Sequence, residues 1–251
     1  MRRGIFFTGV LLILLSLISS CSDDNDYYSV GEYGISLGLI DTTNTFGYDY
    51  LIRCDNGDSL LPAITAFYGY KPTHKQRVLV NFSPLDKVGD SKKLLYAKIN
   101  NLSDVLYKEI IEATEANADS LGNDPVIIDD IWLSNGILNI EFRVWGNVRT
   151  HFINLSYVPN EQEDIDEPIE LTFRHNRNDD DENYLLYGLV SFDLSKLQQP
   201  DSDSIAFRII STDYNGKSHT NSGTYIYGDG LKERPVVKSN IQHTGYSLLS
   251  E

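Results

Sequence analysis

The chain has 251 residues, with 36 Asp and Glu against 21 Lys and Arg, and a formal net charge of −15 at pH 7. Such an acidic chain is a poor partner for nucleic acid or for an anionic lipid surface, because Lys and Arg contacts hold both. Only Cys21 and Cys54 are present, which excludes a disulfide framework and a zinc site built from cysteines.

Residues 1–20 are typical of a secretory signal. Arg2 and Arg3 precede an apolar stretch that ends in small residues, and this order marks a segment that is removed during export. The stretch is short for a membrane-spanning helix, which needs ~20 apolar residues. Removal of residues 1–20 takes away these two arginines and no acid, so the formal charge goes from −15 to −17.

The segment that follows predicts where the protein resides. Ile18-Ser19-Ser20-Cys21 resembles the bacterial lipobox, and this resemblance implies lipidation of Cys21. Several acyl chains together make a stable membrane anchor. Residues 21–32 are expected to form a flexible acidic tether. The tether resembles the export signal of surface-exposed lipoproteins in some Gram-negative bacteria, through Ser22, Asp23, Asp24 and Asp26.

We therefore predict an outer-membrane lipoprotein that is exposed on the cell surface, with the periplasmic face of the membrane as the alternative. The lipid on Cys21, and not basic charge, would hold the protein to the membrane. No nucleic-acid partner is expected.

Residues 33–106 are predicted to form a small five-stranded β-barrel. Runs of β-branched and aromatic residues end at Gly, Asn and Asp, which is typical of strands, and Asn56-Gly57 between two such runs indicates a hairpin. We predict an OB-type barrel, with an SH3-like barrel as the alternative. The expected strands are Tyr33–Ile40, Phe46–Cys54, Ser59–Ala66, Lys75–Phe82 and Leu94–Ile99.

Residues 107–124 are predicted to connect this barrel to a second domain. Ser103 could cap a helix over Asp104–Glu115, where Leu106 and Ile110 stand at helical spacing. The residues around Tyr107 fit a strand equally well, so both alternatives stay open.

Residues 125–235 are predicted to form a seven-stranded β-sandwich, followed by a polar C-terminal tail at 236–251. Ile137–Trp145 alternates, which places Leu138, Ile140, Phe142 and Val144 on the core side and leaves Ile137, Asn139, Glu141, Arg143 and Trp145 mostly toward water. The fold class is thus all-β. The expected strands are Val126–Trp132, Ile137–Trp145, Thr150–Val158, Ile169–Arg174, Tyr184–Asp193, Asp203–Thr212 and Gly223–Tyr227.

The layout as a whole resembles the NigD-like lipoprotein family, which joins an N-terminal OB-type domain to a C-terminal β-sandwich. This resemblance covers essentially the whole mature chain and implies, at most, protection against a bacteriocin-like toxin. It supplies no catalytic or binding residues. The residues that carry it are the lipobox, Ile111–Pro125, Ile131-Trp132, Gly136–Ile140 and Phe207–Ile210.

No catalytic, metal or cofactor site is predicted. The five histidines form no close ligand pair, and neither a nucleophile elbow nor a P-loop occurs. The acidic run 178–182 is expected to be a solvated loop, with a calcium site as the sharper alternative. Cys54 lies in a strand-like run and is expected to be buried as a small hydrophobic residue.

Aromatic residues on the barrel offer one candidate binding surface, because aromatic rings are natural platforms for sugars and OB barrels bind oligomers on this face. Packing within the barrel is the alternative explanation. The family resemblance and the absence of catalytic motifs lead us to predict a non-enzymatic envelope protein that binds a protein partner, and these aromatic residues make surface glycan binding the second hypothesis. The candidate residues are Tyr48, Tyr50, Phe67, Tyr68 and Tyr70.

Overall fold

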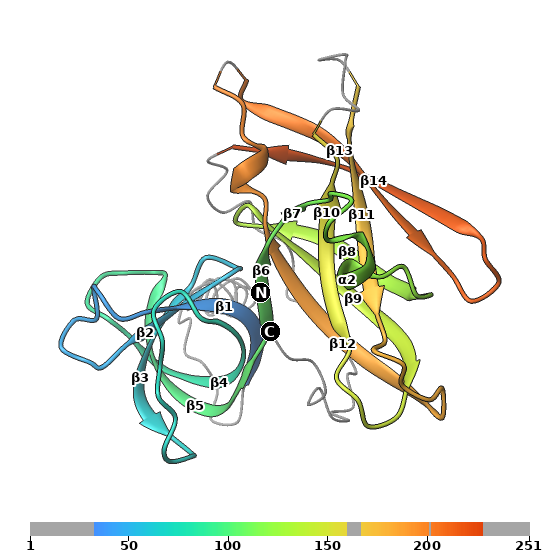
Figure 1. Ribbon diagram of the computed structural model, residues 1–251. Coiled ribbons are helices and arrows are strands. Elements are labelled where there is room, and N and C mark those ends of the chain that lie inside the picture. Colours follow the sequence, from blue (N-terminus) through green and yellow to red (C-terminus); the bar gives the residue numbers. More distant parts are fainter. Residues whose placement is uncertain (1–32, 160–166, 201, 228–251) are drawn as a thin grey trace, which may run out of the picture. The chain divides into compact units, whose positions relative to one another are not determined.

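The computed structural model describes residues 33–159, 167–200 and 202–227 (Figure 1). The predicted signal peptide, the lipidation site Cys21, the export signal and the tail at 236–251 lie outside this part of the chain. Within it, no helix is both long and apolar enough to cross a membrane. More than half of the described residues are in strands and only a few are in helices, which confirms the predicted all-β class.

The first module is a closed five-stranded barrel. Its strands follow the order β1-β2-β3-β5-β4, and β4 pairs back onto β1. The β3–β5 pair is parallel and the other pairs are antiparallel, which confirms the OB-type barrel. The strands are β1 (Gly34–Asp41), β2 (Leu51–Cys54), β3 (Ser59–Thr65), β4 (Arg77–Lys87) and β5 (Leu94–Asp104).

Strand β2 is shorter than predicted, because the chain turns before it. Phe46 and Gly47 both have positive φ angles, of 52° and 90°, and Tyr48 N–H donates to the carbonyl of Thr45 at 3.0 Å. A bulky residue at positive φ is incompatible with a strand. The aromatic run that begins at Phe46 is therefore a loop up to Tyr50.

The barrel interior is filled by aliphatic side chains from all five strands. Cys54 lies among them and is a free thiol, as predicted. Burial raises the pKa of this thiol, so Cys54 behaves as a packing residue. The other buried members are Ile40, Tyr50, Ile52, Leu60, Val78, Val80, Phe82, Leu95, Ala97 and Ile99.

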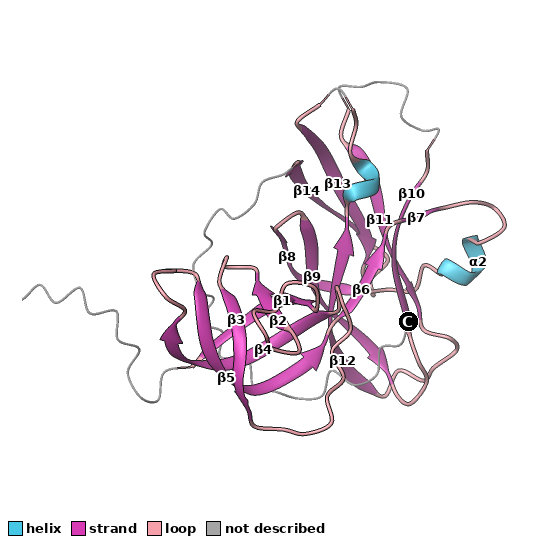
Figure 2. Cartoon of the chain, turned by 90° about the vertical axis from the view of Figure 1, so that its left-hand side faces the viewer, coloured by secondary structure: helices cyan, strands magenta, loops and turns pink. Residues whose placement is uncertain are grey.

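The second module is a β-sandwich of two sheets, with strand orders β14-β13-β11-β10-β7 and β6-β12-β9-β8 (Figures 1 and 2). The described part of this module thus has nine strands, two more than predicted. Its elements are β6 (Leu106–Glu109), β7 (Ile111–Glu112), α2 (Ala118–Leu121), β8 (Ile127–Ser134), β9 (Ile137–Gly146), β10 (Phe152–Tyr157), β11 (Ile169–Asn176), β12 (Tyr184–Asp193), η2 (Ser195–Leu197), β13 (Ser204–Thr212) and β14 (Ser218–Ile226).

The two additional strands come from the segment Asp104–Glu115, for which the sequence allowed either a helix or a strand. β6 pairs with β12 in one sheet, β7 pairs with β10 in the other, and both pairs are parallel. Ile110 stands between them and is buried in the sandwich core. The chain thus crosses from one sheet to the other at Ile110, and a single helical turn, α2, forms only later.

The alternation of β9 is confirmed on its core side and departs from expectation on the other. Leu138, Ile140, Phe142 and Val144 are all buried in the core. Asn139, expected to face water, is fully buried as well. A polar side chain is rarely buried without partners, and its partners come from both modules.

A buried polar network joins the barrel to the sandwich, which belong to one compact unit. Arg77 of β4 donates to both carboxylate oxygens of Asp55 in the barrel, at 2.6 and 2.5 Å. The same guanidinium donates to Asn139 Oδ1 at 2.9 Å and to Ser191 Oγ at 3.2 Å in the sandwich. Ser134 Oγ donates to Asp55. Asn139 can therefore be buried because its Oδ1 accepts one hydrogen bond from the barrel, from Arg77, and one from Ser191 of the sandwich.

Candidate functional site

The aromatic residues predicted as a binding surface divide between packing and exposure. Tyr50 is buried in the barrel core, and Phe67 packs against that core. Tyr70 contacts both, with ring centroids 6.4 Å from Tyr50 and 6.1 Å from Phe67. Its hydroxyl donates to Asp104 Oδ1 at 3.1 Å. Burial, followed by the charge of Asp104, raises the pKa of Tyr70.

The remaining two members do not join this group. Tyr48 is half-buried, and its ring lies 6.3 Å from the ring of Tyr96. Tyr68 is fully exposed. The structure therefore brings Tyr50, Phe67 and Tyr70 together as packed rings and leaves Tyr68 as the one ring of the set that is wholly open to solvent.

The acidic loop 178–182 is organised around a buried carboxylate. Asp180 accepts backbone N–H hydrogen bonds from Asn147, Val148 and Arg149 and lies 3.2 Å from His151 Nε2. Although burial raises the pKa of Asp180, these hydrogen bonds outweigh it and hold the pKa well below its usual range. The loop was expected to be solvated throughout, and Asp180 departs from that because it binds the β9–β10 turn.

Two buried histidines extend this arrangement. His151 Nδ1 lies 2.9 Å from His175 Nε2, and His175 Nδ1 lies 2.9 Å from the carbonyl oxygen of Pro125. His175 Nδ1 must carry a hydrogen, because a carbonyl only accepts. Burial lowers the pKa of His175 to about 4, so its Nε2 accepts the hydrogen of His151 Nδ1. Both imidazoles are enclosed and serve to fix the loop.

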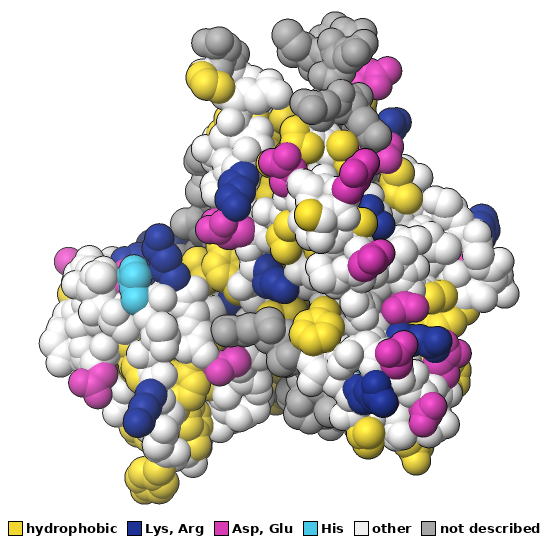
Figure 3. Space-filling model, in the orientation of Figure 1, with side chains coloured by type: hydrophobic (Ala, Val, Ile, Leu, Met, Phe, Trp, Pro, Cys, Tyr) yellow, Lys and Arg dark blue, Asp and Glu magenta, His cyan; other side chains and the backbone are white. Residues whose placement is uncertain are grey.

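In the part of the chain that the structure describes, no group of three or more His, Cys, Asp or Glu side chains is arranged to hold a metal ion. On the face shown in Figure 3, the described Lys and Arg side chains over the sandwich are scattered, and several of them lie beside acids. The sandwich therefore offers, on that face, no continuous basic patch of the kind that tracks a phosphate backbone.

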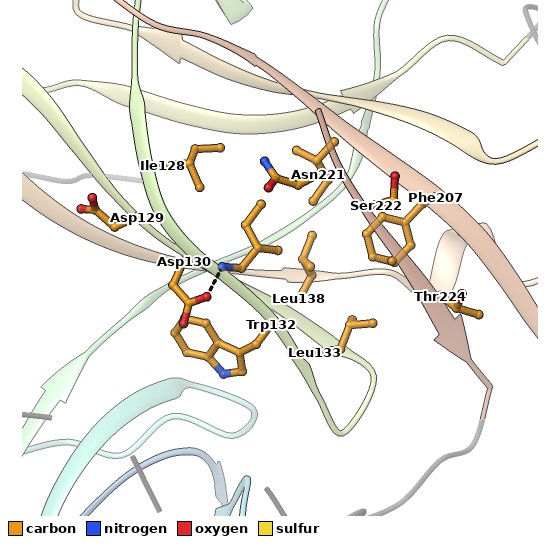
Figure 4. A pocket seen from close by; sticks show the side chains of 13 residues that line it. Ile128, Asp129, Asp130, Trp132, Leu133, Leu138, Phe207, Asn221, Ser222 and Thr224 are labelled. Atoms are coloured by element: carbon orange, nitrogen blue, oxygen red, sulfur yellow. Dashed lines mark hydrogen bonds between the residues drawn. The ribbon is translucent and has the colours of Figure 1, made fainter. Parts of the chain in front are cut away.

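The sandwich has an open groove between the edges of its two sheets. β8 is the last strand of the four-stranded sheet and β14 is the last strand of the five-stranded sheet. The groove between them has a volume of about 370 Å³. Figure 4 shows Ile128, Leu138 and Phe207 around it, with Asn221 of β14 facing them.

The walls of the groove differ in chemistry. On β8, Ile128, Ile131 and Leu133 pack against the sandwich core. On β14, Asn221 is exposed, whereas Tyr225, four residues further along the strand on the same face, is buried. The inner face of β14 thus extends beyond the core at Asn221. The groove is therefore apolar at its base and polar along its β14 edge.

Strand β8 has a β-bulge in its middle. Its register with β9 shifts between Ile128 and Asp130, so Asp129 is the additional residue. Arg143 of β9 donates to both oxygens of Asp129, at 3.0, 2.7 and 2.7 Å, and this hydrogen bonding raises the pKa of Arg143. The bulge therefore turns Asp129 toward a basic partner.

Two acids face each other on the outer face of the same sheet. Asp130 is exposed and stands directly opposite Glu141 in the register. Burial, followed by the charges of Asp130 and Asp129, raises the pKa of Glu141. Like charges opposite each other on neighbouring strands are destabilising, so this position is electrostatically suited to an incoming cation.

Strand β8 could be predicted from the sequence, whereas the groove could not. The signal in the sequence was Asp129-Asp130 inside an otherwise apolar run, Ile127–Leu133. Two consecutive acids cannot both point away from the core in a regular strand. They therefore indicate a bulge on an exposed edge. That β14 closes the other side of the groove depends on long-range pairing, which no local pattern reveals.

An OB-type barrel that leads into a β-sandwich, with an open groove between two sheet edges, defines a two-module all-β protein with a surface suited to binding. The family comparison is more specific. The N-terminal OB domain of the NigD-like family matches residues 40–105, and the NigD-like C-terminal β-sandwich domain matches residues 109–225. The chain belongs to the NigD-like family.

Solved structures agree with this assignment. A protein described as toxin-related, from Parabacteroides distasonis, is 31% identical, with 78% of this chain and 95% of that chain covered and a TM-score of 0.66. A NigD-like immunity protein from Bacteroides caccae is 20% identical, with 80% and 99% covered and a TM-score of 0.60.

A protein described as a lipoprotein, from Bacteroides fragilis, is 10% identical, with 78% of this chain and 98% of that chain covered and a TM-score of 0.54. The similarity to this protein and to the Bacteroides caccae protein shows a shared fold. No curated protein matches the sequence.

Proposed function

We propose that this chain is a non-enzymatic lipoprotein of the cell envelope that binds a protein partner and thereby protects the cell against a proteinaceous toxin. The observation that carries the proposal is the NigD-like architecture over both modules. The Bacteroides caccae protein with the same fold is called an immunity protein, and the relative from Parabacteroides distasonis is called toxin-related.

The proposed anchor is the lipid on Cys21. The lipobox-like sequence before it supports this, as does the name of the Bacteroides fragilis protein, a lipoprotein. Residues 22–32 would then tether the barrel to the outer membrane, and the acids among them favour exposure on the cell surface. A Cys21→Ala variant is expected to leave the membrane fraction and to lose labelling by a fatty acid. If both properties persist, the anchor is wrong.

The proposed binding surface is the groove between β8 and β14. It combines exposed backbone edges, an apolar floor and unbalanced acids, three features that suit a protein partner. Deletion of the gene is expected to raise sensitivity to one member of a panel of bacteriocin-like toxins, and expression of the full chain should restore resistance. Unchanged sensitivity across the panel would contradict the immunity role.

The second hypothesis, glycan binding at the barrel, is favoured by one observation. Tyr68 is fully exposed next to the packed rings of Phe67 and Tyr70, as an aromatic platform for a sugar would be. A glycan array probed with the protein and with Tyr68→Ala tests this hypothesis. A signal that survives the substitution, or no signal at all, removes Tyr68 as a sugar-binding residue.

A further inference from the structure

The edge of strand β8 has the geometry of a strand acceptor. β8 pairs with β9 on one side and ends its sheet on the other. An edge strand presents backbone N–H and C=O groups, onto which an extended segment of another protein can add. β8 is 8 residues long, which is sufficient for a regular strand pair.

An added strand would meet two different environments. Residues that alternate along a strand point to opposite faces. Side chains on one face would enter the groove beside Ile131 and Leu133, toward Phe207 and Ile209. Side chains on the other face would lie over the outer surface of the sheet, beside Asp130 and Trp132.

The outer surface at this place carries uncompensated negative charge. Asp129 is paired with Arg143. In the described part of the chain, neither Asp130 nor Glu141 forms an ion pair. The two carboxylates stand opposite each other on neighbouring strands. A Lys or Arg side chain from a partner would relieve that repulsion.

We propose that β8 takes an extended segment of the partner protein in which apolar residues alternate with Lys or Arg. The apolar side chains fill the groove between β8 and β14, and a basic side chain lies beside Asp130 and Glu141. This inference rests on the proposed function, because it names the kind of segment through which the protein partner is recognised.

The competing explanation is edge protection. A bulge and charged residues on an edge strand also discourage edge-to-edge aggregation. The two explanations differ in one measurable respect, because protection predicts no binding of an extended peptide, whereas strand addition predicts binding that depends on the peptide backbone.

The test uses the full chain and acetylated peptides of 8 residues, the length of β8. One peptide alternates valine and lysine, the second alternates valine and glutamate, and the third is the lysine peptide N-methylated at every second residue. We expect the lysine peptide to bind and each of the other two to bind at least about tenfold more weakly by calorimetry. Absent binding, or equal binding of the three, overturns the proposal.

Matched variants locate the site. Asn221→Tyr should fill the groove and weaken the lysine peptide about tenfold. Thr220→Tyr, on the opposite face of β14, should leave binding unchanged. Asp130→Asn should weaken it about threefold to tenfold. Asp86→Asn is the control, because both carboxylates are exposed and accept the next N–H at 2.8 Å. Equal effects within either pair contradict the assignment.

Two other occupants are separated by further measurements. If the lysine peptide binds only after the chain is shortened to end at Tyr227, the groove belongs to the segment 228–251 and the proposal is wrong. If light scattering shows a dimer that Asn221→Tyr dissociates, the occupant is a second copy and the proposal is also wrong. Peptide binding to the monomeric full chain supports the proposal.

The proposed function can fail independently. Peptide binding together with unchanged toxin sensitivity of the deletion strain would remove the immunity role and keep strand addition. Protection that persists in the Asn221→Tyr variant, with no peptide binding, would keep the immunity role and remove this inference.

Discussion

The side chain of Arg77 is fully buried and makes hydrogen bonds to both modules. Its removal would leave the carboxylate of Asp55 without its charged partner and would take away one of the two donors to Asn139 Oδ1, the other being Ser191 Oγ. Breaking a buried pair by removing one partner typically costs 3–5 kcal/mol. We therefore expect Arg77→Met to lower the free energy of unfolding by about 3–5 kcal/mol, measured by urea denaturation.

A double variant provides the control for this prediction. Arg77→Met combined with Asp55→Asn removes the buried charge together with its partner, so the double variant should be more stable than the sum of the two single effects implies. A coupling free energy of about 0.5–3 kcal/mol is typical for residues in contact. Strictly additive effects would show that the pair contributes no coupling.

The lowered pKa of His175 should make the free energy of unfolding depend on pH. Its pKa is about 4 in the folded chain against an ordinary value of 6.5, so the unfolded chain binds more protons between these values. Stability is then fully present above pH 6.5 and decreases as the pH falls toward 4, by up to about 3 kcal/mol. Urea denaturation at pH 7 and pH 5 measures this change.

The titration can be assigned to His175 by substitution. His175→Gln should reduce the loss of stability between pH 7 and pH 5, whatever its stability at pH 7. His74→Gln is the matched control, because His74 is exposed and lies on the barrel. An unchanged pH dependence in the His175 variant would mean that other groups titrate. The pKa of Asp180 lies below its usual range. Its contribution to stability is therefore lost only when the pH falls below the ordinary pKa of an aspartate.

At the scale of single elements, the end of helix α2 depends on one glycine. Gly122 has a φ of 68°, and a Cβ atom there would lie 2.7 Å from the carbonyl oxygen of His175. Gly216, in the β13–β14 turn, has a φ of 74° with open space around it. Gly122→Ala therefore carries backbone strain plus a steric clash, whereas Gly216→Ala carries strain alone.

We expect Gly216→Ala to lower the free energy of unfolding by about 1 kcal/mol. Gly122→Ala should lower it by more than that, because the backbone of β11 must also move. Thermal denaturation of the two variants in parallel measures the difference. Equal losses would show that the segment around α2 adjusts without cost.

The strands themselves could largely be predicted from the sequence, because alternation is local information. β9 is the clearest case, since its core side was identified residue by residue. Asn139 on its other side could not be predicted, because only the approach of Arg77 from the barrel explains its burial. β6 and β7 were left open for the same reason, since they are short and gain their pairs from β12 and β10 far along the chain.

The candidate site was less accessible from the sequence than the fold. The aromatic residues of the barrel were visible as a group, yet a ring in the core such as Tyr50 cannot be told from an exposed one such as Tyr68 by pattern alone. The groove needs two edges, β8 and β14, that are brought together only by the order of strands in the two sheets.

At the scale of the whole molecule, the Arg77 network predicts that barrel and sandwich unfold together. Both tryptophans, Trp132 and Trp145, lie in sandwich strands, so tryptophan fluorescence reports the sandwich while circular dichroism reports all strands. The two signals should give coincident urea transitions. In Arg77→Met we expect the transitions to separate, and coincidence in that variant would contradict a role of the network in coupling the modules.

We propose that this NigD-like chain protects the cell by binding a protein through the groove between β8 and β14. The most direct measurement is toxin sensitivity of the deletion strain carrying the unaltered chain, Asn221→Tyr or Thr220→Tyr at equal abundance in the membrane fraction. We expect Thr220→Tyr to protect like the unaltered chain and Asn221→Tyr to leave the cells as sensitive as the deletion strain. Full protection by Asn221→Tyr would contradict binding of the partner in this groove.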